Sequence, residues 1–233
     1  MGAAYFDALY AADEDPWGFA TSPYERAKYD RTMAALGDRR FGRGLEVGCS
    51  IGVLTARLAE RCDRLLAVDV AASAVARARE RLAGAPGVTV ERRALPDEMP
   101  DGPFDLIVAS EVLYYWDAAL LARGWDALRD ALAPGGSLLA VHWRGPVRHD
   151  PQGGDAVHDA IGARADGLVH AVSARTRDYR LDRWDRPLPG PSPRPGPACA
   201  AAGWAPAPTR RTGSSRASTR WRRRRASPPP TSR

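Results

Sequence analysis

The sequence predicts an α/β protein with a doubly wound, mostly parallel, seven-stranded sheet. From residue 44 onward, apolar strand-like runs alternate with helical segments. This alternation is typical of parallel sheets that carry helices on both faces. The first apolar run leads into a turn that holds Gly48 and Gly52, and a helical segment follows at once. A strand, a glycine turn and a helix in this order bring backbone N–H groups to a ligand.

The expected elements follow one another in the order that this fold class requires. Strands of a parallel sheet are expected at residues 44–47, 64–69, 88–92, 104–110 and 136–143. Helices are expected at residues 52–61, 71–83, 117–132 and 154–164. Two further extended segments, residues 167–173 and 178–184, can form a hairpin that closes one edge of the sheet.

Residues 1–40 are expected to form a helical lid ahead of a domain at residues 41–186. Ser22 precedes Pro23, which is the pattern of a helix N-cap with proline at the first helical position. The helix that it opens should end near Leu36. We expect the lid to fold over a bound ligand and to exclude water.

The net charge of +6 is unevenly distributed along the chain. Residues 191–233 hold ten arginines and no acid, so residues 1–190 carry −4. Residues 187–233 are rich in Pro, Arg, Ala, Ser and Gly and are expected to be disordered, because they cannot bury enough apolar surface to offset chain entropy. The basic run at residues 221–225 can bind nucleic acid or anionic lipid. We favour three other interpretations together: a solvated basic tail, an extension without function, and translation of a reading frame other than the ancestral one. A nucleic-acid partner is therefore not expected.

The remaining composition points to a soluble, cytoplasmic protein without a membrane partner. No apolar run approaches the roughly 18 residues that a membrane span needs, and the N-terminus lacks the pattern of a secretory signal. The three cysteines show no metal-binding spacing, so we expect reduced thiols and no metal site. Cys49 lies near a helix N-terminus, where a thiolate can be stabilised. A small residue tolerated beside a ligand is the favoured interpretation.

The glycine turn itself indicates a cationic ligand. A dinucleotide-binding loop needs a third small residue where this chain has Val53. Glu46 stands two residues before Gly48, where its charge would repel a pyrophosphate but would attract a cation. Asp69 ends the second strand about 20 residues further on, where a carboxylate commonly binds ribose hydroxyls. A nicotinamide-dependent oxidoreductase stays as the alternative from another enzyme class, and a nucleic-acid-binding protein acting through its basic tail is a third.

Several segments together resemble class I S-adenosylmethionine-dependent methyltransferases. Leu45–Gly52 resembles motif I of that superfamily, and the resemblance extends over roughly residues 40–143 through Asp69, residues 93–96, 104–115 and 132–137. The flanking segments resemble the nodulation protein S branch, whose members N-methylate the free amine of a chitooligosaccharide precursor. The segments that carry this second resemblance are residues 15–17, 24–26, 28–29, 142–144 and 154–158.

The resemblance implies S-adenosylmethionine as co-substrate and assigns residues to it. The methionyl part would lie against Gly48, Cys49, Ser50 and Gly52, with Glu46 near its ammonium, directly or through water. Asp69 would accept the ribose hydroxyls, and Val70, Ala94 and Leu95 would lie by the adenine. Ser110 would follow the fourth strand, and Trp17 would line the pocket from the lid. Arg93 stands where the superfamily often has an acid for the adenine amino group, so a backbone carbonyl or Asp97 would have to replace it.

Two of these residues have plain structural alternatives. Glu46 can be a buried acid with a local hydrogen-bond partner. Asp69 can be the N-cap of the helix expected at residues 71–83.

The best-supported reaction is N-methylation of an amine on a small-molecule or saccharide acceptor. Positioning supplies most of the acceleration of such a transfer, but the amine must arrive unprotonated. Glu111, His142 and, less favoured, His158 can serve as the base, and Tyr114 is expected beside the reaction centre. His142 can equally be a packed structural histidine, and His149 and His170 are interpreted as surface or strand residues. The roles of Tyr24, Tyr115 and Trp116 stay open, and Trp143 is the one strong candidate for an exposed aromatic in a groove for a chitin-type acceptor. O-methylation of a natural product is the nearest alternative reaction.

Overall fold

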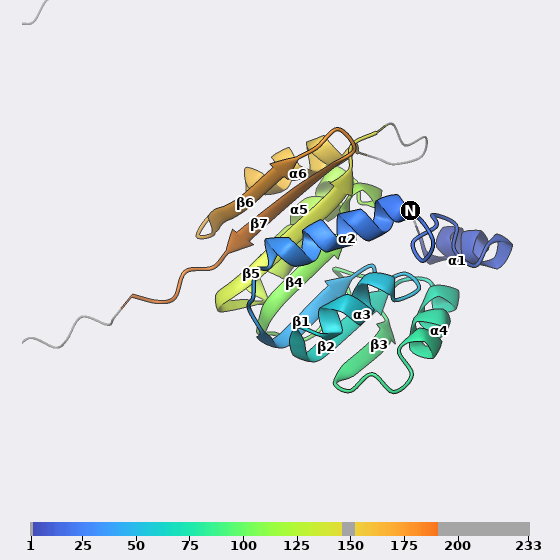
Figure 1. Ribbon diagram of the computed structural model, residues 1–233. Coiled ribbons are helices and arrows are strands. Elements are labelled where there is room, and N and C mark those ends of the chain that lie inside the picture. Colours follow the sequence, from blue (N-terminus) through green and yellow to red (C-terminus); the bar gives the residue numbers. More distant parts are fainter. Residues whose placement is uncertain (1, 146–151, 191–233) are drawn as a thin grey trace, which may run out of the picture. The chain divides into compact units, whose positions relative to one another are not determined.

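A seven-stranded sheet forms the centre of the computed structural model, which describes residues 2–145 and 152–190 (Figure 1). The strands lie in the order β3-β2-β1-β4-β5-β7-β6. Only β7 runs antiparallel to its neighbours β5 and β6. The strand bounds are β1 (Phe41–Val47), β2 (Cys62–Asp69), β3 (Val88–Arg92), β4 (Phe104–Ser110), β5 (Leu132–Trp143), β6 (Val169–Arg175) and β7 (Tyr179–Asp185). The predicted fold class is confirmed.

Helices cover both faces of this sheet. They are α1 (Ala3–Ala12), α2 (Pro23–Ala35), α3 (Val53–Ala59), α4 (Ala72–Arg81), α5 (Ala118–Asp130) and α6 (Gly154–Gly162), with a short 3-10 turn η1 (Leu113–Tyr115). Helices α2 and α3 pack on one face and α5 and α6 on the other (Figure 1). The predicted tail spans residues 187–233. Residues 187–190 are exposed and lie outside any helix or strand, and residues 191–233, like His149, lie outside the described residues.

Strand β4 illustrates how the sequence fills both layers. Leu106 and Val108 face the α2–α3 layer, and Ile107 and Ala109 face the α5–α6 layer. All four side chains are fully buried. A strand covered on both faces is therefore apolar at every position rather than at alternate positions, as its sequence indicates.

The N-terminal segment forms helices that begin close to where the sequence predicts. The Ser22 hydroxyl accepts a hydrogen bond from the Glu25 N–H at 3.4 Å, and Pro23 opens α2. Helix α1 packs against α4, with Tyr10 buried beside Ala71 and Ala74. These contacts attach the N-terminal segment to the glycine-turn side of the sheet.

The expected hairpin is present, but its second strand lies inside the sheet. Strand β7 inserts between β5 and β6, which leaves β6 as the edge strand. Strand β5 also begins earlier than expected, at Leu132. Residues 133–137, with Pro134 and two glycines, belong to this extended segment, which has a register shift against β4. Gly135 has φ +78° there, which allows the chain to bend without breaking the pairing.

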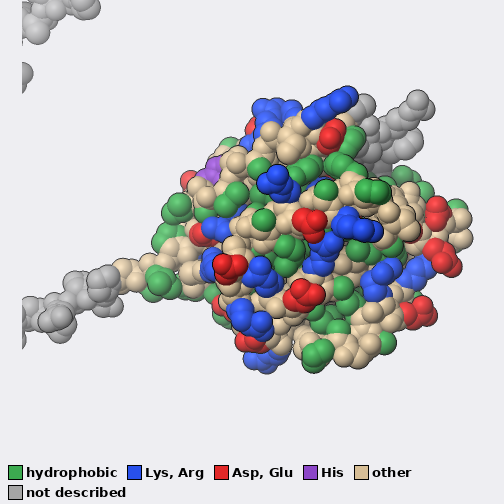
Figure 2. Space-filling model, viewed as in Figure 1, with side chains coloured by type: hydrophobic (Ala, Val, Ile, Leu, Met, Phe, Trp, Pro, Cys, Tyr) green, Lys and Arg blue, Asp and Glu red, His purple; other side chains and the backbone are tan. Residues whose placement is uncertain are grey.

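The surface seen in Figure 2 carries basic and acidic side chains interspersed, without a large patch of one sign. Large hydrophobic side chains are exposed at Tyr5, Trp17, Val169 and Leu188. Among the described residues, no helix has the length and apolar character that a membrane crossing requires.

Candidate functional site

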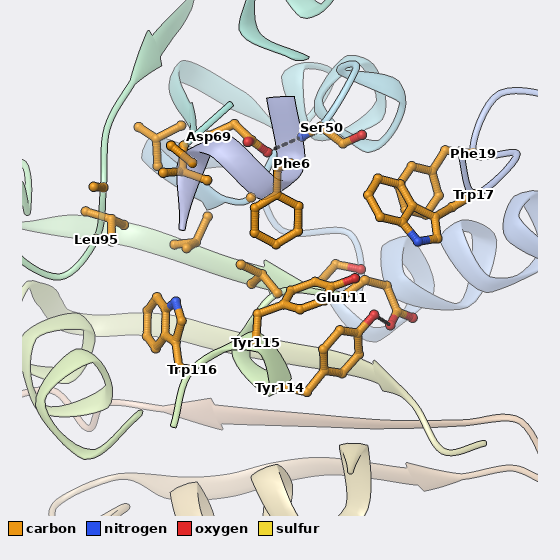
Figure 3. Close-up of a pocket in the computed structure, with 18 of the residues that line it drawn as sticks. Phe6, Trp17, Phe19, Ser50, Asp69, Leu95, Glu111, Tyr114, Tyr115 and Trp116 are labelled. Atoms are coloured by element: carbon orange, nitrogen blue, oxygen red, sulfur yellow. Dashed lines mark hydrogen bonds between the residues drawn. The ribbon is translucent and has the colours of Figure 1, made fainter. Parts of the chain in front are cut away.

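A cavity of about 660 Å³ opens at the carboxyl ends of β1, β2 and β4 (Figure 3). The strand order reverses between β1 and β4, which is where doubly wound sheets bind ligands. The cavity collects most of the residues that the sequence assigns to the site. These are Trp17, Gly48, Ser50, Asp69, Val70, Ala94, Leu95, Ser110, Glu111 and Tyr114.

The turn after β1 needs glycine at two positions for two different reasons. Gly48 lines the cavity with φ +73°, and a Cβ there would lie 2.8 Å from Val112. Gly52 has φ +80° and is the N-cap of α3, and a Cβ there would lie 3.2 Å from Ala78 of α4. Gly52 does not line the cavity, so its assignment to the cofactor is corrected: it lets two helices approach closely.

Asp69 faces the cavity with both carboxylate oxygens already held by backbone. Oδ2 accepts the Ser50 N–H and Oδ1 accepts the Ala71 N–H, each at 2.9 Å. Burial raises the pKa of Asp69, although these hydrogen bonds counteract it. Asp69 is not the N-cap of α4, because that position is Ala71. A first-turn N–H of α4, that of Ser73, donates instead to Asp7 Oδ1 at 3.3 Å. Each oxygen keeps a lone pair for a further donor in the cavity.

Glu46 lies behind the glycine turn rather than on the main cavity. It lines an adjoining space of about 20 Å³, which is room for about one water molecule. Only 2% of the residue is exposed, and among the described residues its Oε2 has no hydrogen-bond partner. Burial and, to a smaller degree, the charge of Asp69 raise the pKa of Glu46 to about 8. Thr55 is the local side chain that counteracts this rise, and Oε2 is the carboxylate oxygen without a partner among the described residues.

Cys49 also lines the small space and not the main cavity. Burial raises the pKa of its thiol well above the ordinary value, which disfavours a thiolate there. This agrees with the favoured interpretation of Cys49 as a small, uncharged side chain in the turn.

The loop after β3 supplies one wall of the cavity. Val70, Ala94 and Leu95 line it, as predicted. Arg93 lines it too, and its Nε donates to Glu91 Oε2 at 2.6 Å. Asp97 also reaches the cavity, which leaves a carboxylate near the position that the superfamily's acid would occupy.

Glu111 is the most heavily hydrogen-bonded acid of the cavity. Its Oε2 accepts the Tyr114 hydroxyl at 2.8 Å and the Trp143 N–H at 2.9 Å. Its Oε1 accepts the ammonium of Lys28 at 2.6 Å. Glu111 has φ +55°, an uncommon conformation for a residue other than glycine and one that recurs at functional sites.

Lys28 and Glu25 complete this cluster, and sequence reasoning assigned them no role in the site. Both line the cavity from α2, and the Lys28 ammonium donates to Glu25 Oε1 at 2.8 Å. Lys28 is 2% exposed, and burial raises the pKa of Glu25 despite the neighbouring ammonium. One signal could have found them: Lys28 is the single lysine among 34 basic residues.

Aromatic side chains from both ends of the described chain enclose the cavity. Those whose role the sequence left open, Tyr24, Tyr115 and Trp116, all line it, and so does Trp143, the aromatic expected in an acceptor groove. Phe6 of α1 meets the Tyr115 ring edge-on with centroids 4.9 Å apart, so the lid reaches the turn after β4 (Figure 3). Trp17 stacks on Phe19 at 5.6 Å on the same side.

His142 does not reach the cavity, and its predicted role as a base is corrected. His142 is fully buried. Its Nε2 accepts the Leu113 N–H at 3.1 Å, and its Nδ1 lies 3.0 Å from His158 Nε2. Neither ring nitrogen is left to take a proton from an acceptor. His158 is buried in the same way, and His170 lies on the edge strand as expected.

Comparison with known proteins identifies one family over residues 8–145. A family model described as Nodulation protein S (NodS) matches residues 8–145. The Nodulation protein S of Rhizobium tropici is 35% identical over 130 residues, which are 55% of this chain and 55% of that protein. The chain spans about half the length of the curated relatives it matches.

Solved structures share the fold over most of their length. A Pseudomonas syringae protein described as a methyltransferase is 45% identical with a TM-score of 0.62, covering 70% of this chain and 99% of that chain. The N-methyltransferase NodS from Bradyrhizobium japonicum WM9, in complex with S-adenosyl-L-homocysteine, is 26% identical with a TM-score of 0.70, covering 79% and 98%. The sheet is thus the class I methyltransferase fold, and the predicted resemblance is confirmed. Since the family model covers more than half of its residues, the chain belongs to the Nodulation protein S family.

Proposed function

We propose that this protein is an S-adenosylmethionine-dependent methyltransferase that N-methylates an amine on a small-molecule or saccharide acceptor. One observation carries the proposal: a single cavity joins two sets of groups that this reaction requires. The Gly48 turn and Asp69 line it from β1 and β2, and the Glu25–Lys28–Glu111 cluster lines it from α2 and β4.

The first set fits the cofactor. Gly48 carries no Cβ where the turn borders the cavity, and Asp69 offers two oxygens to ribose hydroxyls. Glu46 is a buried acid whose Oε2 lacks a partner among the described residues, beside a space large enough for one bridging water. An ammonium on the far side of that water would satisfy it. When bound, S-adenosylmethionine supplies an electrophilic methyl group.

The second set fits an amine acceptor. Two carboxylates and one ammonium give the Glu25–Lys28–Glu111 cluster a net charge of −1, and because these side chains are buried, the charge attracts a cation more strongly than it would in bulk water. Glu111 is held in place by three donors and orients the acceptor. Because burial raises the pKa of Glu25, its carboxylate is the more suitable proton acceptor from the arriving amine. Tyr114 and Trp143 border the same end.

The known relatives support the same class of reaction. The Bradyrhizobium japonicum protein is an N-methyltransferase crystallised with S-adenosyl-L-homocysteine. The Nodulation protein S family model matches residues 8–145, the segment that contains both sets of cavity groups. The identity of the acceptor follows from neither observation, so a saccharide amine and other small amines are tested together.

Titration calorimetry of the full chain with S-adenosyl-L-homocysteine, and separately with a nicotinamide dinucleotide, tests the cofactor assignment. We expect micromolar or tighter binding of S-adenosyl-L-homocysteine and no heat from the dinucleotide. Binding of the dinucleotide alone would support the oxidoreductase alternative and would overturn the proposal.

A further inference from the structure

We propose that His142, His158 and Asp182 form a one-directional hydrogen-bonded chain that positions the Tyr114 turn of the cavity. The chain lies entirely behind the cavity wall. Its members come from β5, α6 and β7, and each is fully buried. None of the three is used in the proposed reaction, and a buried polar cluster of this size calls for its own explanation.

The direction of the chain follows from one fixed donor. The Leu113 N–H can only donate, so His142 Nε2, 3.1 Å away, carries no proton. The neutral ring then holds its proton on Nδ1 and donates it to His158 Nε2 at 3.0 Å. By the same logic His158 holds its proton on Nδ1 and donates to Asp182 Oδ2 at 2.7 Å. Both tautomers are thereby assigned from the contacts.

Asp182 is the last acceptor of the hydrogen-bonded chain, and it is a carboxylate anion. Its Oδ2 also accepts from Arg180 Nε at 2.8 Å, and its Oδ1 pairs with His170 Nε2 at 2.9 Å. Burial alone would raise the pKa of Asp182, but the hydrogen bonds, with His158 first, hold the pKa below its usual range. The carboxylate therefore accepts from His158, His170 and Arg180, and the Ser173 side chain also stabilises its charged form.

The two buried imidazoles stay neutral because their surroundings disfavour a second proton. Burial lowers the pKa of His142, and His158 and the Lys28 ammonium of α2 act in the same direction. Burial also lowers the pKa of His158, where Arg180 adds to the effect and Asp182 and Asp155 oppose it. A proton added at His142 Nε2 would point at the Leu113 N–H and break that contact.

The near end of the chain touches the cavity in two ways. Leu113 is the first residue of η1, so its held N–H sets the start of the turn that carries Tyr114 and Tyr115. The His142 ring also packs edge-on against the Tyr114 ring with centroids 5.3 Å apart. Tyr114 in turn donates to Glu111 Oε2, so the buried chain fixes a hydroxyl at the acceptor end of the cavity. His142 is on this basis a positioning residue rather than a base.

The tautomers can be tested on the unmodified full chain without any activity. Long-range ¹H–¹⁵N correlation spectra are recorded between pH 5.5 and 8, and the four imidazoles are assigned with His149→Gln and His170→Gln. We expect His142 and His158 both to be neutral with the proton on Nδ1 across this range. Protonation of His142 or His158 on Nε2, or an imidazolium at either residue at pH 7, would overturn the proposed hydrogen-bonded chain. This holds even if neither His142 variant folds.

Two variants test the positioning role, and this part rests on the proposed function. His142→Phe removes the acceptor for the Leu113 N–H, whereas His142→Gln keeps an oxygen within its reach. We expect Phe to lower kcat for methyl transfer at least tenfold, Gln to restore it to within threefold, and both to keep the Kd of S-adenosyl-L-homocysteine within threefold. A folded Phe variant with unchanged kcat would contradict positioning. Absence of methyl transfer in the unmodified chain would instead contradict the proposed function and leave the tautomer result standing.

Discussion

The Lys28 ammonium lies 2.6 Å from Glu111 Oε1 although 83 residues separate them in the sequence. The contact joins α2 to the turn after β4, and a second contact joins the same ammonium to Glu25 at 2.8 Å. All three side chains are at most 9% exposed. Removing a buried ammonium that two carboxylates share is costly, because it leaves two buried negative charges without a counter-charge.

We therefore expect Lys28→Met to lower the free energy of unfolding by about 3–5 kcal/mol. Equilibrium unfolding in urea, followed by fluorescence, measures the change. Arg26→Met is the matched control, since Arg26 is exposed on the same helix and should change stability by less than about 0.5 kcal/mol. Equal losses in the two variants would show that the buried pairing contributes nothing specific.

Asp69→Asn should weaken the binding of S-adenosyl-L-homocysteine by about tenfold or more. An amide offers one acceptor oxygen instead of two, and its NH₂ would oppose either the Ser50 N–H or the Ala71 N–H. Titration calorimetry measures the loss. Asp63→Asn on the exposed side of the same strand should leave the affinity unchanged, and an Asp69 variant that binds as tightly as the parent would remove Asp69 from the site.

Glu46 should make the stability of the protein fall as pH rises. Its folded pKa of about 8 lies above the ordinary value of 4.5, so its stabilising contribution is complete below about pH 4.5 and is lost as pH rises through 8. Between these values the loss is about 1.4 kcal/mol per pH unit. Urea unfolding of the parent and of Glu46→Gln at pH 5.5 and 7.5 measures this loss. The free energy of unfolding of Glu46→Gln, relative to that of the parent, should be higher at pH 7.5 than at pH 5.5. The exposed control Glu60→Gln should show the same pH dependence as the parent.

The same carboxyl links cofactor binding to proton release. Glu46 must ionise to accept from an ammonium, so binding of S-adenosyl-L-homocysteine at pH 7 should release up to one proton. Calorimetry in two buffers of different ionisation enthalpy measures this number, and Glu46→Gln should abolish it. Equal proton release from parent and variant would separate Glu46 from the ligand's ammonium.

Gly52→Ala should destabilise the fold by about 1–3 kcal/mol without a specific loss of cofactor affinity. The added Cβ would enforce strain at φ +80° and would press on Ala78 of α4 at 3.2 Å. Gly37→Ala separates the two causes, because Gly37 has φ +64° and nothing within 4 Å of the added Cβ. Gly37→Ala should therefore cost less in thermal unfolding, and a large loss of cofactor affinity in a folded Gly52 variant would return Gly52 to the binding site.

Local patterns predicted the part of the cavity around Gly48 and Asp69 and missed Lys28 and Glu25 beside Glu111. Gly48 and Asp69 belong to short motifs whose function depends on a strand end and the turn after it, so sequence spacing was sufficient. The Lys28–Glu111 pair depends on how α2 packs across the sheet, which no local pattern encodes. His142 was misjudged for a related reason: the apolar run of β5 is buried on both faces and gives no signal of which side each residue faces. Only the packing of α6 reveals that His142 faces His158.

The most direct test of the central proposal is a labelled-methyl transfer assay on paired acceptors, each amine compared with the alcohol of the same skeleton and amino sugars compared with the corresponding neutral sugars. Mass spectrometry of the products locates the methyl group. Methyl transfer from S-adenosylmethionine to the nitrogen of at least one amine, with the matched alcohol unchanged, is the expected result. Methylation of hydroxyl groups alone would contradict the assignment of the Glu25–Lys28–Glu111 cluster to an amine acceptor.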